Sequence, residues 1–136
     1  MVAYSFQPEF VDPIRAGTKC QTIRADRKRH ARAGEQLQLY RGMRTRGCFL
    51  IGRAVCLSAQ PIRIMISDEE ALRHFHTIEL PMQDKRIRWR SDLDDFAVQD
   101  GFSHWPAMQK FWREHHPEVT TFFGVLIRWH QFGLPA

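Results

Sequence analysis

One stretch in the middle of the chain, GCFLIGRAVCLSAQPIRIMI at positions 47–66, constrains the fold more than any other. It is long and rich in apolar residues, and Gly52 and Pro61 interrupt it. Glycine inside a strand commonly marks a bend, and proline is confined to strand ends, edges and bulges. We therefore expect two strands here, consecutive or bent, and hence a substantial β-sheet.

Other segments mix strands with helices. Residues 19–25 have the β-branched content of a strand, residues 35–42 alternate apolar and polar side chains, and residues 121–132 form a β-rich run near the end of the chain. Helical patterns cover residues 8–17, 67–78, 92–102 and 106–116, with Gly17 and Gly101 as expected stops, Ser67 as an N-cap and Pro106 in a first turn. Helices and strands do not alternate strictly, so we predict an α+β fold, a small curled sheet or barrel with several helices attached.

The size of the chain fits one domain spanning residues 1–136. Hydrophobic residues make up 43% and charged residues 26%, which is typical of a globular protein and unlike a disordered one. An apolar run of membrane-spanning length and a secretory signal are both absent, so we expect a cytoplasmic protein with no membrane partner. The three cysteines lack metal-ligand spacing, so disulfides, metal ions and other cofactors are not expected.

The basic residues are unevenly distributed. The formal net charge is +5, and cations gather at 24–32, 41–53 and 85–90. Clustered cations favour a polyanionic partner, because they gain affinity by releasing counterions from phosphates. A basic face that serves only solubility is the alternative.

The segment GTKCQTIR at 17–24 contains the candidates for chemistry. A threonine hydroxyl becomes a nucleophile when a base removes its proton, and a lysine held neutral by burial can be that base. Lys19 and Thr22 are an odd number of positions apart, so strict strand alternation would send them to opposite faces. They converge if Lys19 precedes the regular strand or if a bulge resets the alternation. Thr22 and Arg24 share a face, although a plain strand edge with solvated cations would also fit.

Four motifs in order resemble a phage-associated subgroup of the ASCH domain family, a branch of the PUA-like superfamily. They are Gly17-x-Lys19-x-x-Thr22-x-Arg24, the following GEQLQLYRGMRT, AVQDGF at 97–102 and the closing FFGVLIRW at 122–129. This resemblance covers nearly the whole chain. It implies a small PUA-like mixed β-barrel with surrounding helices, and a role in binding RNA or nucleotides.

Some members of this family are metal-independent amidohydrolases that deacylate N4-acylated cytidine, with a lysine, a threonine and an acid as the catalytic set. By resemblance, these roles fall on Lys19, Thr22 and Asp100. Asp100 departs from the family, whose acid is a glutamate, and capping of a helix that begins near Ser103 or Pro106 is its alternative role.

Two functions therefore stay open. The first is deacylation of a modified nucleoside, in which Thr22 attacks the acyl carbonyl or Lys19 activates a water. The second is an RNA-binding module without turnover; ribonuclease activity is a weaker third possibility. Oligomeric state, monomer or weak dimer, is left open. The residues expected to contact a nucleoside or RNA are Arg24, Lys28, Arg29, Arg44, Phe102 and Trp129.

Overall fold

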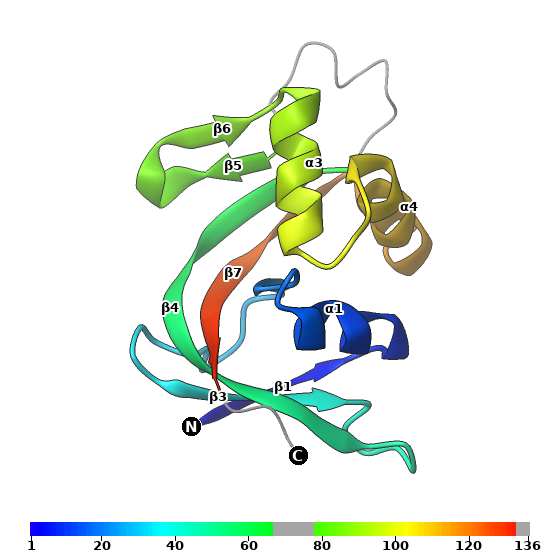
Figure 1. The fold of residues 1–136 in the computed structure, drawn as a ribbon. Helices are drawn as coiled ribbons and strands as arrows, with labels where there is room; N and C mark the ends of the chain where they lie inside the picture. Colours follow the sequence, from blue (N-terminus) through cyan, green and yellow to red (C-terminus); the bar gives the residue numbers. More distant parts are fainter. Residues whose placement is uncertain (67–77, 133–136) are drawn as a thin grey trace.

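The computed structural model of the protein describes residues 1–66 and 78–132, and its fold is mixed α+β (Figure 1). Its strands are β1 (Val2–Phe6), β2 (Gln21–Arg24), β3 (Gln36–Arg41), β4 (Phe49–Met65), β5 (Ile78–Leu80), β6 (Lys85–Ile87) and β7 (Thr121–Phe132). The described α-helices are α1 (Val11–Ala16), α3 (Arg90–Gln99) and α4 (Trp105–His115). Single 3-10 turns cover Pro8–Phe10 and Pro81–Gln83. The helix expected at 67–78 lies outside the described residues, except for Ile78, which begins β5.

The apolar stretch that predicted strands forms the single long strand β4, which curves through the molecule (Figure 1). β4 pairs with β3 through its first half, with β5 near its end, and with β7 from Arg53 to Met65. A register shift between Cys56 and Ser58 marks an irregularity, and such bulges bend a strand and increase its twist. Pro61 is tolerated within the strand, where it lies opposite Val125. One bent strand thus replaces a pair of shorter ones.

The sheet curls but does not close, so the expected barrel is wrong. β1 pairs in parallel with β3 at one edge, and β2 pairs with β7 at the other. Within the described residues, no backbone ladder joins β1 to β2. A side chain spans this gap instead, because Arg24 Nη2 donates to the Ser5 carbonyl at 2.7 Å. We call the gap between the edges of β1 and β2 the seam.

The three described α-helices lie inside the curve of the sheet (Figure 1). The buried apolar residues form two clusters. The first joins β1, β3 and the start of β4 to α1, and the second joins the end of β4 and β5 to α3 and α4. Phe102 and Phe111 are partly buried and pack against both clusters. The two aromatic rings therefore lie at the junction of the two cores.

Two helices end at the glycine residues that the sequence predicts as stops. Gly17 ends α1 with φ 81°, and Gly101 follows α3 with φ 100°, a backbone region that favours glycine. α4 begins at Trp105, one residue before the predicted range, with Pro106 in its first turn. Its N-cap is His104, whose Nδ1 accepts from Ala107 N at 3.1 Å. Among the described residues, no helix has the length and apolar character needed to span a bilayer.

Candidate functional site

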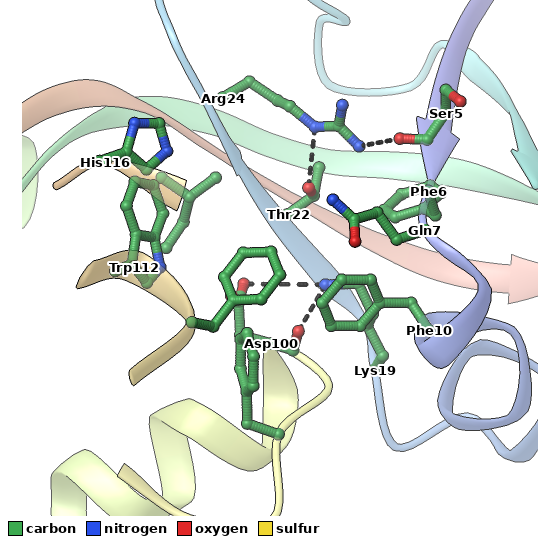
Figure 2. A pocket seen from close by; sticks show the side chains of 13 residues that line it. Ser5, Phe6, Gln7, Phe10, Lys19, Thr22, Arg24, Asp100, Trp112 and His116 are labelled. Carbon is green, nitrogen blue, oxygen red and sulfur yellow. Dashed lines mark hydrogen bonds and ion pairs between the residues drawn. The ribbon is translucent and has the colours of Figure 1, made fainter. Parts of the chain in front are cut away.

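A cavity of about 210 Å³ opens at the seam (Figure 2). β1 and the 3-10 turn after it form one wall, Lys19 and β2 form another, and the end of α3 with α4 completes it. Cavities that hold drug-sized ligands are commonly about 300–1,000 Å³, so this one suits a single small ring system. The lining residues are Ser5, Phe6, Gln7, Phe10, Lys19, Thr22, Ile23, Arg24, Asp100, Phe102, Phe111, Trp112 and His116.

Lys19 and Thr22 line the same cavity because Lys19 precedes the regular strand. The Lys19 amide donates to Pro13 O at 3.1 Å, and the Cys20 amide donates to Gln99 O at 2.9 Å. The ladder of β2 with β7 begins at Gln21, opposite Arg128. The Cys20 carbonyl also accepts from Trp129 N of β7 at 3.0 Å, but the Lys19 amide is bonded to α1, so Lys19 precedes the ladder and strand alternation does not decide where it points. This is one of the two arrangements under which the sequence allowed the two residues to converge.

The Lys19 side chain is buried, with 3% of its surface exposed. Its Nζ donates to the Gln21 carbonyl at 2.8 Å and to the Asp100 carbonyl at 2.5 Å. It lies 4.7 Å from the centre of the Phe10 ring, a distance typical of a cation–π contact. Burial lowers the pKa of Lys19 from 10.5 to about 8; Asp100 opposes this shift and Arg24 adds to it.

Asp100 lies directly after α3 and faces Lys19 (Figure 2). Its Oδ1 is 3.9 Å from Lys19 Nζ and accepts a hydrogen bond of 3.4 Å from Gln21 Nε2. Burial raises the pKa of this carboxyl from 3.8 to about 6, although Lys19, Gln21 and Arg24 all pull it down. The capping alternative for Asp100 is wrong, because His104 caps α4.

Gly101 is needed for the close approach of Lys19. A Cβ atom at this position would lie 2.7 Å from Lys19 Cδ and 2.9 Å from Phe10 Cδ1. Side-chain contacts this short force a neighbour to move. The sequence Asp100-Gly101 therefore places a carboxylate beside the lysine and removes the side chain that would otherwise occupy the lysine's space.

Thr22 and Arg24 form a pair on the other wall of the cavity (Figure 2). Arg24 Nε donates to Thr22 Oγ1 at 3.0 Å, which leaves the threonine hydroxyl hydrogen free. The guanidinium also lies 4.9 Å from the centre of the Phe6 ring. Lys19 Nζ lies 5.5 Å from the centre of the same ring, so both basic side chains lie near Phe6. Among the described residues, no hydrogen bond joins Lys19 to Thr22 in this state.

The structure brings only some of the other predicted binding residues to the cavity. Phe102 lines it and meets Phe10 edge to face, with ring centres 5.4 Å apart. Trp129 does not line it; its ring is 2% exposed and packs against Phe6 in the first core cluster. The remaining predicted residues lie outside the lining.

These remaining residues are three exposed cations on loops. Lys28 and Arg29 lie in the loop after β2, where Arg29 pairs with Glu35 at 2.6 Å. Arg44 is exposed in the turn between β3 and β4 and has φ 67°, an unusual conformation for a residue with a side chain. The cations predicted to contact phosphate are thus on the surface, while the lysine and arginine of the central motif are in the cavity.

Several residues of the site were not predicted from sequence. Gln21 has no exposed surface and contacts Asp100, although glutamine at the start of a strand gives no sign of burial. Phe6 places its ring near both Lys19 and Arg24, and Trp112 and His116 also line the cavity. Trp112 lies in the helix predicted at 106–116, and an aromatic residue at helical spacing is typical of core packing. Only the proximity of α4 to the seam, a tertiary feature, could have assigned it to the cavity.

The described part of the chain contains no group of three or more histidine, cysteine, aspartate or glutamate side chains placed to hold a metal ion. Comparison of the chain with family models, curated proteins and solved structures finds no match.

Proposed function

We propose that the protein is a metal-independent hydrolase that removes the acyl group from an N4-acylated cytidine-type nucleoside. In this proposal Lys19 is the base, Thr22 provides or positions the nucleophile, and Asp100 controls the charge of Lys19. The fold assignment is part of the same proposal: we infer that the curled sheet is a PUA-like fold of the ASCH type whose seam is the active site.

The hydrogen bonding of Lys19 is the observation that carries the proposal. A neutral amine has two N–H groups and one lone pair, whereas an ammonium ion has three N–H groups and none. The two carbonyl acceptors at Gln21 and Asp100 satisfy both N–H groups of the neutral form, whereas the third N–H of the ammonium form has only the Phe10 ring and the more distant Asp100 carboxylate. Because the pKa of Lys19 is lowered to about 8, a useful fraction of the amine is neutral close to pH 7. A lysine in this state can accept a proton.

The reaction begins with transfer of a proton from the attacking O–H to the lone pair of Lys19. The oxygen then forms a bond to the acyl carbon, and the carbonyl electrons move onto the carbonyl oxygen. Arg24 contacts Thr22 directly, and its guanidinium is therefore placed to stabilise that developing negative charge. When the C–N bond breaks, the Lys19 ammonium returns its proton to the departing exocyclic amine, which leaves as cytidine.

Thr22 can take part in two ways. If Thr22 Oγ1 is the attacking atom, the acyl group is transferred to it and a water releases the acid in a second step. If water attacks directly, Thr22 Oγ1 positions it. Quenched reactions analysed by intact mass distinguish the two, because only the first gives a protein heavier by the acyl group.

The direct test is hydrolysis of N4-acetylcytidine, followed by the ultraviolet change on formation of cytidine. We expect turnover by the native protein and a loss of about a hundredfold or more in Lys19→Met and Thr22→Val, as is typical when a proton-transfer group is removed. Lys110→Met is the matched control for Lys19→Met, since its side chain is exposed and belongs to a surface ion pair. Full activity in Lys19→Met would exclude this lysine as the base.

The net charge of +5 favours a second candidate, an RNA-binding module that does not turn over its ligand. Such a module should bind single-stranded RNA with a steep dependence on salt, and should lose affinity when Lys28 and Arg29 are replaced by alanine. It should be insensitive to Thr22→Val. A folded native protein that binds RNA in this way and leaves N4-acetylcytidine intact would favour this candidate over the hydrolase.

A further inference from the structure

A chain of polar side chains leads from the cavity to the far side of β2. Arg128 of β7 donates from Nε to Gln21 Oε1 at 3.3 Å, and Gln21 donates from Nε2 to Asp100 Oδ1 at 3.4 Å. The same carboxylate oxygen lies 3.9 Å from Lys19 Nζ. Gln21 is completely buried, so water cannot replace either of its bonds without a change in packing.

The cation of Arg128 fixes which end of the amide faces Asp100. A guanidinium has only donors, so the side of Gln21 that faces Arg128 must be its carbonyl oxygen. The NH₂ group then points to Asp100. The flipped amide would put two donors together at Arg128 and two acceptors together at Asp100, which is doubly unfavourable in a buried site.

We propose that Gln21 is a positioning residue, whose amide holds the Asp100 carboxylate ionised and directed at Lys19, and that Arg128 locks this amide in the orientation that can donate. This inference rests on the proposed function for its catalytic consequence. The effect of Gln21 on the charge of Asp100 can be measured in the protein without substrate, and so does not depend on turnover.

Asp100 is surrounded by other groups that influence its charge. Lys19 and Arg24 favour the ionised carboxylate, and burial disfavours it. Cys20 lies next to Lys19 in the chain, and His116 of α4 lines the same cavity. Gln21→Leu leaves all of these groups in place and adds no charge, so a change in the titration of Asp100 in that variant reports the loss of the amide donor.

Two substitutions of Gln21 separate its role as a hydrogen-bond donor from its role in filling space. Gln21→Leu removes both hydrogen bonds. Gln21→Glu keeps the shape and the acceptor for Arg128, but an ionised carboxylate cannot donate to Asp100 and adds a negative charge beside it. Arg128→Leu leaves the amide in place and removes its lock. Gln60→Leu is the matched control, because Gln60 is also a buried glutamine in the sheet and lines a separate cavity with Arg27 and Phe123.

The first readout is the titration of the Asp100 carboxyl carbon, followed by NMR of aspartate-labelled protein without substrate. We expect the midpoint to move to higher pH in Gln21→Leu, at least as far in Gln21→Glu, and less in Arg128→Leu. Gln60→Leu should leave it unchanged. A midpoint in Gln21→Leu equal to that of the native protein would overturn the proposal. If Gln21→Leu does not fold, an unmoved midpoint in both Gln21→Glu and Arg128→Leu would overturn it.

The second readout is the pH dependence of kcat/KM on N4-acetylcytidine. We expect about a tenfold loss at pH 7 in Gln21→Glu, the lower end of the range for hydrogen bonds to charged groups, because the 3.4 Å bond is long. The acid limb, which reports the loss of the Lys19 proton, should move to higher pH in Gln21→Glu because the added carboxylate favours the Lys19 ammonium, and to lower pH in Gln21→Leu, as in Asp100→Asn. A lower rate with an unmoved limb would show a purely structural role and overturn the inference. Absence of turnover in the native protein would refute the proposed function. The NMR titration would still test the coupling of Gln21 and Arg128 to Asp100.

Discussion

Replacing the buried ion pair by neutral side chains should change how stability depends on pH in a characteristic way. The perturbation is the double substitution Lys19→Met and Asp100→Asn, which keeps an apolar stem against Phe10 and an amide beside Gln21. Subtracting the unfolding free energy of this variant from that of the native protein cancels the titration of all other groups to a first approximation.

The magnitude follows from the two displaced pKa values. The pKa of Lys19 falls from 10.5 to about 8, so between these values the unfolded chain holds a proton that the folded protein has lost. Stability therefore rises with pH in that window. The pKa of Asp100 rises from 3.8 to about 6, so between these values the folded protein holds the extra proton. There stability falls as pH rises.

The difference curve should therefore be a valley. Its floor lies between about pH 6 and pH 8, where both groups are charged in the folded protein. Each wall should be about 3 kcal/mol high, since a displacement of one pH unit corresponds to 1.36 kcal/mol. Urea unfolding at constant ionic strength, from pH 4 to pH 10.5, measures the curve.

A conventional stabilising ion pair would give the opposite shape. Its lysine pKa would be raised and its carboxyl pKa lowered, so the native protein would gain most over the variant in the middle of the range. A hump of this kind would refute the reasoning. A flat curve would refute it too, because it would mean that water reaches both groups and that their pKa values are ordinary.

The catalytic pH range, one glycine and one helix cap offer further tests. The kcat/KM for N4-acetylcytidine should rise with pH to a plateau above about pH 8 as Lys19 loses its proton, and the midpoint should move to lower pH in Asp100→Asn, where no carboxylate opposes the effect of burial. Gly101→Ala should cost about 2–4 kcal/mol in urea unfolding, from backbone strain and overpacking against Lys19. Gly34→Ala has a similar positive φ but no atom within 4 Å of the added Cβ, so it should cost only the strain; equal losses would contradict the packing argument. His104→Ala should cost about 1 kcal/mol as a lost N-cap, and no loss would mean that the bond of Trp105 N to Asp94 caps α4 alone.

Local patterns predicted most of the elements. Apolar spacing and terminal glycines located α1 and α3, and the apolar stretch at 47–66 located β4. Closure of the sheet could not be predicted in this way, because it depends on whether β1 and β2 meet edge to edge. That depends on the path of α1 between them and on the Arg24 side chain that reaches Ser5.

The candidate site shows the same division between local and tertiary information. The motif with Lys19, Thr22 and Arg24 identified three residues that line one cavity, and the Thr22–Arg24 contact follows from strand alternation alone. The contact of Lys19 with Asp100 joins positions 81 apart in the chain and depends on how α3 ends. Trp129 has an aromatic side chain of the kind that stacks on bases, but its position in β7 directs it into the core.

The seam has a mechanical consequence. In a closed barrel, widening an interior cavity breaks several ladder hydrogen bonds at once, because every strand is bonded on both sides. Here β1 and β2 are each bonded on one side only, and the contact of Arg24 with Ser5 is the hydrogen bond that links the two edges. Spreading at this line would therefore break one hydrogen bond to a charged group and the contacts of Lys19 and Arg24 with the Phe6 ring, but no ladder hydrogen bond of the sheet. A ligand that competes for the Arg24 guanidinium would release that bond as it enters, so binding and opening would be the same event.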